Sequence, residues 1–202
     1  EYVFDGAKGG AYVESDATNP LNAYGRSKLA GEQAVQAVGG DWLVFRTSWV
    51  YGGRGKNFLR TMLRLAAERD TLSVVADQSG APTSARMIAD ATAHIVRQAQ
   101  RERAARGFES GIFHLTAGGD TTWHGFASKI IDDARTALPA GAIKAHSIEA
   151  IPTSAYPTPA RRPANSVLDN TKVERRFGLA RPSWQSAADC ILGEIFERAA
   201  AG

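Results

Sequence analysis

Sulfur-containing residues are scarce in this sequence, which has one cysteine, Cys190, and two methionines among its 202 residues. A single cysteine excludes an internal disulfide and a cysteine-rich metal site, and it suits a reducing compartment, so we expect a cytoplasmic protein. The sequence also lacks any apolar run of about 18 residues, which excludes an ordinary membrane-spanning helix and predicts no membrane partner.

Charge of one sign is scarce as well, because the 24 lysines and arginines exceed the 21 aspartates and glutamates by only three. So small an excess, without a stripe of basic residues interleaved with aromatic ones, predicts no nucleic-acid partner. The 44% of hydrophobic and 22% of charged residues are ordinary for a globular chain and exclude disorder, collagen and a coiled coil.

The chain begins without a methionine. Glu1 leads directly into the apolar run Tyr2-Val3-Phe4, which we expect to form a buried strand. A chain that starts inside a strand is expected to be part of a larger protein, and a targeting segment could have preceded it.

Short β-rich segments alternate with segments of helical periodicity along the rest of the sequence. This alternation is typical of α/β folds, and the few strands resemble the rear part of a Rossmann-like doubly wound parallel sheet. We expect strands at 42–47, 72–75, 111–116 and 145–148, and helices at 23–37, 57–69, 84–101, 122–137, from 171, and at 183–200.

Two helix starts carry specific signals. Asn22 is expected to cap the first helix, and a capping box spanning 171–174 is expected to open a short one. The apolar face of the first helix is expected to consist of Leu29, Ala30, Ala34 and Val35.

Several common catalytic motifs are missing. There is no G-x-S-x-G, no G-x-G-x-x-G after a predicted strand, and Gly55-Lys56 is followed by Asn57, so it is not part of a P-loop. The four histidines have neither the HExxH arrangement nor a paired spacing typical of metal ligands, so no metal site is expected.

A tyrosine and a lysine four residues apart, Tyr24 and Lys28, remain as candidate catalytic groups. This spacing puts both side chains on one face of a helix. A nearby ammonium favours the ionised form of a phenol, which could then exchange a proton with a carbonyl oxygen near neutral pH. Taken alone, the pair fits better with a partly buried aromatic side chain beside a solvated lysine.

The surroundings of the pair reverse that preference, because five segments occur in a characteristic order: YVFDG, NPLNAYGRSKLAGE, RTSWVYGGRGKNF, DQSGAPTSA and PTSAYPTPARRPANS. Together they resemble the dTDP-4-dehydrorhamnose reductases of the extended short-chain dehydrogenase/reductase superfamily. The resemblance covers nearly the whole chain. It implies a remaining part of a Rossmann-like domain at 1–52 and a substrate-binding α/β region at 53–202, with strand 111–116 returning to the first sheet.

The resemblance implies reduction of the C4 ketone of dTDP-6-deoxy-L-lyxo-4-hexulose to dTDP-L-rhamnose, with NADPH or NADH as cofactor. Tyr24 would be the general acid, and Lys28 would contact the nicotinamide ribose. Thr47 and Ser48 would pass backbone groups to the nicotinamide. A further Thr or Ser, which usually bonds the ketone oxygen, would stand immediately before Glu1.

The resemblance also implies contacts with the dTDP-deoxyhexulose substrate by Glu1, Tyr2, Trp49 and Arg162. Trp49 and Tyr2 fit almost as well as core aromatic residues. Arg162, with Arg161, fits better as a solvated surface pair than as a bidentate partner of the diphosphate.

This sequence departs from the resembled family at two points. A glycine-rich turn at a helix N-terminus, which dinucleotide binding needs, is missing, so we expect no reductase activity from these residues alone. Ser84-Ala85-Arg86 stands where some relatives have an acidic residue at a metal-bridged contact, so a Mg²⁺-bridged homodimer is not supported.

Two other functions remain open. One is a reductase or epimerase of the same fold that acts on another nucleotide sugar. The other is a non-catalytic regulatory subunit, against which the presence of both Tyr24 and Lys28 argues moderately.

Overall fold

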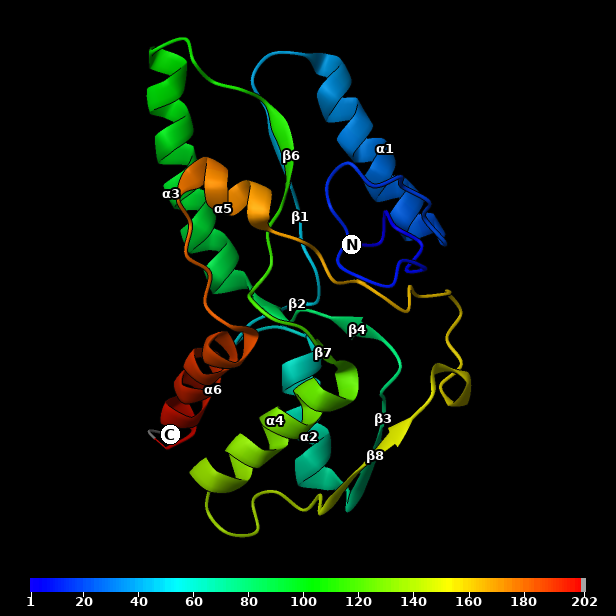
Figure 1. Cartoon of the computed structure of the whole chain (residues 1–202). Coiled ribbons are helices and arrows are strands. Elements are labelled where there is room, and N and C mark those ends of the chain that lie inside the picture. The colour runs from blue at the N-terminus through cyan, green and yellow to red at the C-terminus, as the bar shows by residue number, and fades with distance from the viewer. Residues whose placement is uncertain (201–202) are drawn as a thin grey trace.

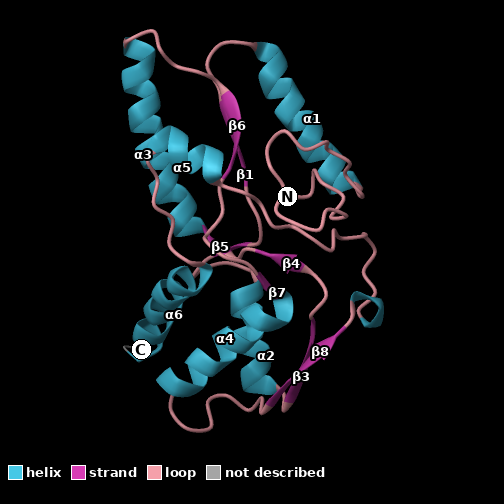
Figure 2. Ribbon diagram, viewed as in Figure 1, coloured by secondary structure: helices cyan, strands magenta, loops and turns pink. Residues whose placement is uncertain are grey.

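The computed structural model describes residues 1–200, in which strands and helices alternate as the sequence predicts (Figures 1 and 2). The helices are α1 (Ala23–Val38), α2 (Phe58–Glu68), α3 (Ala85–Ala104), α4 (Trp123–Ala137), α5 (Thr171–Phe177) and α6 (Trp184–Ala200), with the 3₁₀ helix η1 at Thr153–Ala155. The strands are β1 (Leu43–Arg46), β2 (Val50–Tyr51), β3 (Thr71–Val75), β4 (Ser79–Gly80), β5 (Thr83–Ser84), β6 (Gly111–His114), β7 (Thr121–Thr122) and β8 (Ser147–Ile151).

The strands of the described chain form pairs, three parallel and one antiparallel. β1 pairs with β6, β2 with β5 and β3 with β8 in parallel, whereas β4 and β7 are antiparallel. Parallel partners far apart in the sequence require crossover connections, and helices supply them here. The predicted α/β class with parallel strands is therefore confirmed.

Side-chain caps fix where the helices begin. Asn22 and Asn57 accept hydrogen bonds from the backbone N–H groups of Gly25 and Arg60. Ser84 and Thr122 do the same for α3 and α4. Each cap satisfies one of the N–H groups that the first turn of a helix leaves without a partner, which is why these boundaries could be predicted.

The main apolar core lies between α2, α4, α6 and the β3–β8 pair, in the lower half of Figure 1. Its centre is α4, whose buried residues recur at the spacing of one helical face. These are Phe126, Ala127, Ile130, Ile131 and Ala134.

The β1–β6 pair has two different faces, because successive side chains of a strand point to opposite sides. One face is apolar, and there Phe45 and Phe113 pack with Ile95 of α3 and Phe177 of α5. Arg46, the next residue along β1, instead bonds Glu32 of α1. Figure 1 shows α3 and α5 on one side of the strand pair and α1 on the other.

Three local predictions are wrong. Tyr2–Phe4 forms a turn rather than a strand, because the Phe4 N–H bonds the Glu1 carbonyl, although Val3 and Phe4 are buried. The capping box at 171–174 is absent: the N-cap of α5 is Asn170, whose side chain bonds Thr116 and Leu168 instead.

The third wrong prediction concerns α1. Leu29 is half-buried, but Ala30, Ala34 and Val35 are exposed. Gly25 and Glu32 are the buried residues of this helix. Their burial means that α1 is held mainly by a close backbone approach and by a charged side chain, neither of which an apolar periodicity reveals.

Candidate active site

A cavity of about 580 Å³ lies beyond the carboxyl end of β1 and beside α1. Ligands of open parallel α/β sheets bind at this end of the strands. The cavity brings together seven of the eight residues predicted for the site, and Ser48 is the exception. Its lining includes Glu1, Tyr2, Tyr24, Lys28, Thr47, Trp49 and Arg162.

Tyr24 and Lys28 lie on the cavity side of α1. The Lys28 ammonium is 5.2 Å from the centre of the Tyr24 ring. Tyr24 is 58% exposed, so its hydroxyl can reach a ligand in the cavity. The two groups therefore share one helix face and one open space, as proton transfer to a bound carbonyl requires.

Close contacts fix the first turn of α1. Gly25 lies so near the Tyr2 carbonyl oxygen that any Cβ at this position would overlap it. The Tyr2 and Tyr24 rings meet edge to face, with centroids 5.4 Å apart. The Asn22 side-chain amide also donates to the Arg161 carbonyl at 2.9 Å, which connects this turn to the proline-rich loop.

Trp49 forms an aromatic wall of the cavity. Its ring stacks on Trp123 with centroids 3.7 Å apart and planes 11° apart. On Gly80, a Cβ would lie 2.5 Å from Cε2 of Trp49. Trp49 also has a φ of 46°, in the left-handed region that non-glycine residues rarely adopt. Such strain is typical of functional sites and persists only where the surroundings enforce it.

Glu1 and Tyr2 also line this cavity. Burial raises the pKa of the Glu1 carboxyl, against the opposing effects of the terminal ammonium and of the Trp49 backbone. Burial also raises the pKa of the Tyr2 phenol, while the nearby Arg162 charge opposes that rise. Both effects keep these side chains more easily protonated than in water.

Thr47 and Ser48 follow β1 directly, but only Thr47 lines the cavity. Thr47 lines the cavity, and its buried Oγ1 has no hydrogen-bond partner in the described chain. Ser48 is fully buried, does not line the cavity, and its Oγ also lacks a partner among residues 1–200. Buried hydroxyls normally have partners, so Thr47 is a candidate contact for a ligand.

A second cavity, of about 440 Å³, adjoins the first. It lies between α2, β3 and the loop that follows η1, and it shares Trp123 and Arg162 with the first cavity. Phe58 packs against Trp123 with ring centroids 4.6 Å apart. Arg162 is exposed and makes no ion pair with any described residue, so its guanidinium is available where the two cavities meet.

Among the residues of these cavities that were not predicted from the sequence are Glu32, Arg46, Phe58 and Trp123. Two of them had a usable signal. Glu32 continues the helix face of Tyr24 and Lys28 by one more turn. Arg46 is a charged residue in a strand predicted to be buried, and buried charges are almost always paired. Phe58 and Trp123 open helices without a motif, so only the tertiary structure reveals them.

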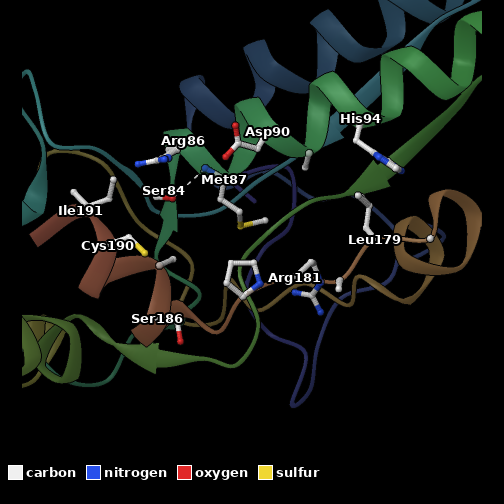
Figure 3. A pocket seen from close by; sticks show the side chains of 15 residues that line it. Ser84, Arg86, Met87, Asp90, His94, Leu179, Arg181, Ser186, Cys190 and Ile191 are labelled. Atoms are coloured by element: carbon white, nitrogen blue, oxygen red, sulfur yellow. Dashed lines mark hydrogen bonds between the residues drawn. The ribbon is translucent and has the colours of Figure 1, made fainter. Parts of the chain in front are cut away.

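A separate cavity, of about 550 Å³, lies between α3, α6 and the loop 178–182 (Figure 3). Several of its polar residues already serve the fold. Ser84 caps α3 by accepting from Met87, a bond drawn in Figure 3, and His94 bonds the Phe177 carbonyl. Arg86 at its rim pairs with Glu194 of α6. Tyr24 and Lys28 do not line this cavity.

The described residues also limit other kinds of site. Within residues 1–200, no three His, Cys, Asp or Glu side chains gather where they could share a metal ion. None of the helices in that part of the chain is long and apolar enough to cross a membrane.

Solved structures with this fold are Rossmann-like extended short-chain dehydrogenase/reductases, and the chain has their architecture. A dTDP-4-dehydrorhamnose reductase from Bacillus anthracis, crystallised in complex with NADP, aligns with a TM-score of 0.79 and 32% identity. It is matched over 96% of this chain and 63% of that one. A reductase of the same name from Clostridium acetobutylicum gives a TM-score of 0.79 at 33% identity.

More narrowly, the chain belongs to the RmlD substrate binding domain family, which matches residues 1–196. A dTDP-4-dehydrorhamnose reductase from Burkholderia thailandensis is 55% identical over 198 residues, or 98% of this chain and 66% of the relative. The reductase from Salmonella typhimurium is 50% identical over 97% of this chain and 64% of its own length. The chain thus spans about two thirds of the length of these relatives.

Proposed function

We propose that these residues form the substrate-binding and proton-donating part of an NAD(P)H-dependent reductase. Its reaction is reduction of the C4 ketone of dTDP-6-deoxy-L-lyxo-4-hexulose to dTDP-L-rhamnose. The observation that carries the proposal is the Tyr24–Lys28 pair facing a cavity with a tryptophan wall. The 55% identity to the Burkholderia reductase supports the choice of substrate.

In this proposal, Tyr24 protonates the oxygen of the reduced carbonyl. Its hydroxyl donates a proton to the C4 oxygen as the hydride, supplied by a reduced nicotinamide, reaches C4, so that the ketone becomes an alcohol. Lys28 stabilises the phenolate that remains, because its ammonium lies beside the Tyr24 ring. Trp49 contacts the deoxysugar through the part of its indole that lines the cavity, because one face of the ring already stacks on Trp123.

We propose that the second cavity holds the nucleoside part of the substrate. Phe58 and Trp123 offer aromatic surfaces there, and such surfaces stack on nucleobases. Arg162, where the two cavities meet, would pair with the diphosphate between base and sugar.

We propose that the 202 residues of this chain form only part of the binding site for the nicotinamide cofactor. Lys28 and the partnerless hydroxyl of Thr47 fit the polar edge of a nicotinamide riboside. A glycine-rich turn for the pyrophosphate is missing from the 202 residues. We therefore propose that this chain binds the nucleotide sugar but does not turn it over by itself.

The division into two parts is also proposed. Residues 1–52 with strand β6 would belong to the Rossmann-like domain, because β6 pairs with β1. Residues 53–202 would otherwise form the substrate-binding region, which is supported by the core around α4. Helices α3 and α5 pack against the β1–β6 pair and would accompany it.

The test is turnover by a hybrid in which the remaining third of the Burkholderia relative is joined to this chain. We expect the hybrid to oxidise NADPH in the presence of the dTDP-keto sugar. Tyr24→Phe should lower kcat by about 100-fold or more while nucleotide-sugar affinity stays within a few-fold, since general acids contribute factors of this size. The 202-residue chain alone should bind dTDP and show no turnover.

Tyr156→Phe is the matched control, because Tyr156 is 57% exposed, close to the 58% of Tyr24, but lines the second cavity and not the first. It should change the apparent KM more than kcat. Unchanged turnover in Tyr24→Phe would contradict the proposed role of Tyr24 and favour another acid or another function. Faster turnover with a UDP-keto sugar would assign the site to another nucleotide sugar.

A further inference from the structure

Helix α1 carries the proposed proton donor, yet little apolar surface holds it. Of its 16 residues, Gly25 and Glu32 are the buried ones. Gly25 fixes the first turn against Tyr2. The rest of the helix needs another attachment, since Val35 and Val38 are exposed.

Glu32 supplies that attachment through a bidentate ion pair with Arg46 of β1. Nε of Arg46 lies 3.0 Å from Oε1 and 3.2 Å from Oε2 of Glu32, and Nη2 lies 2.7 Å from Oε2. The Glu32 and Arg46 side chains are only 10% and 5% exposed. A planar guanidinium bound by two parallel hydrogen bonds allows little rotation of either partner.

The position of the pair relative to the site is specific. Tyr24, Lys28 and Glu32 follow one another at intervals of four residues, so they form a single stripe along α1. Arg46 directly precedes Thr47, which lines the cavity. The ion pair therefore connects the face of α1 that carries Tyr24 and Lys28 to the end of β1, where Thr47 lines the cavity.

Lys28 is not paired with Glu32 in the described structure. The two residues are four apart, a spacing at which opposite charges can pair on a helix. Both carboxylate oxygens of Glu32 are instead bonded to Arg46. The Lys28 ammonium lies 5.2 Å from the centre of the Tyr24 ring.

We propose that Glu32 and Arg46 are positioning residues, whose buried ion pair sets the rotation of α1 and so keeps both Tyr24 and Lys28 facing the cavity. This inference rests on the proposed reductase function for its effect on turnover. The ion pair acts through Tyr24 and Lys28 and contributes no proton or hydride itself.

A structural role and a positioning role can be separated by a double variant, Glu32→Leu with Arg46→Met. Replacing a buried ion pair by apolar residues of similar volume often leaves stability unchanged or raises it, whereas removing one partner destabilises. The double variant should therefore unfold at a denaturant concentration at or above that of the wild type. The single variant Arg46→Met should unfold earlier.

The first readout uses the 202-residue chain and does not depend on the reaction. NMR of the chain with ¹³C-labelled tyrosine should show contacts from the Tyr24 ring to Tyr2 and to the Lys28 side chain in the wild type. The double variant should lose the contact between Tyr24 and Tyr2, which lie in different segments, while its helical circular dichroism is unchanged. Persistence of the Tyr24–Tyr2 contact in the double variant would overturn the inference.

The second readout is turnover of the hybrid described above. The double variant should lower kcat by about 10- to 100-fold, since misplacement of a catalytic group by about 1 Å has effects of this size, with KM for the nucleotide sugar changed less than about threefold. Glu32→Gln keeps the side-chain shape and one hydrogen-bond acceptor, so it should lower kcat less than the double variant does. Wild-type kcat in a folded double variant would contradict a positioning role.

A wild-type hybrid without turnover would count against the proposed function but not against the positioning role. In that case the NMR contacts of the 202-residue chain decide the inference by themselves.

Discussion

Helices α1 and α4 are nearly equal in length, with 16 and 15 residues, but they are held in different ways. α4 buries Phe126, Ile130 and Ile131 in the main core, together with two alanines. α1 buries a glycine and a glutamate. The helix that carries the proposed chemistry is thus fixed by close approach and charge, and the helix that carries the core is fixed by apolar area.

The two halves of the molecule should therefore respond to different perturbations. Apolar packing is sensitive to side-chain volume and has no group that titrates. The close glycine contact depends on shape instead, and the buried ion pair depends on shape and on protonation.

The largest expected effect is loss of stability on truncating the centre of α4. Phe126 is fully buried, and its ring packs on Tyr51, Phe58 and Trp184 at 5.1, 5.6 and 6.0 Å between centroids. Phe126→Ala should lower the free energy of unfolding by about 3–5 kcal/mol, measured by urea denaturation. In α1, Val35→Ala, at a side chain 43% exposed, should change it by less than about 0.5 kcal/mol. Equal losses of unfolding free energy in the two variants would contradict the difference proposed between α4 and α1.

An intermediate effect should come from glycine substitutions within α1. Gly25→Ala forces a Cβ into the Tyr2 carbonyl oxygen and should destabilise by about 1–3 kcal/mol. Gly31→Ala, on the same helix with nothing within 4 Å, should stabilise by up to about 1 kcal/mol. Thermal unfolding of the two variants measures both changes in stability. A stable Gly25→Ala would mean that α1 does not depend on this contact.

The smallest expected effect is a pH dependence on the side of the molecule that holds α1. His114 lies between Phe4 and the Asp169 carbonyl, and burial lowers the pKa of its imidazole from the ordinary value of 6.5, with Glu14 opposing and Arg46 reinforcing the shift. A group that is neutral in the fold but protonated when unfolded stabilises the protein above pH 6.5 and destabilises it as the pH falls below that value.

Urea midpoints should therefore decrease from pH 7 to pH 5. His114→Gln, whose amide can still bond the Asp169 carbonyl, should flatten that slope. Phe126→Ala should leave the slope as it is in the wild type, because no titratable group changes. A wild-type slope in His114→Gln would assign the pH dependence to other groups.

The sequence predicted the elements that have their own local signals. The cap Asn22 marked a helix start correctly, and the run at 42–47 predicted the strand β1. The two-residue strands β2, β4, β5 and β7 were not predicted, because so short a strand has no periodicity of its own and depends on its partner.

The candidate site was predicted in the same uneven way. Tyr24 and Lys28 could be paired from their spacing, since a helix brings residues four apart together. Trp123 could not be connected to Trp49, because 74 positions separate them in the sequence and only the folded chain stacks their rings. Arg46 could be predicted to lie in a strand, but its ion-pair partner Glu32, on another element, could not be predicted.

Trp123 borders both cavities and stacks on Trp49 in one while it contacts Phe58 in the other. A ligand group that shifts this indole in the second cavity should therefore also change the surroundings of Trp49 in the first. Contacts that share a partner give non-additive free energies, so substitutions at Phe58 and Trp49 should be energetically coupled. Under the proposed function, a change of nucleotide base should accordingly alter the rate of the reaction as well as the affinity.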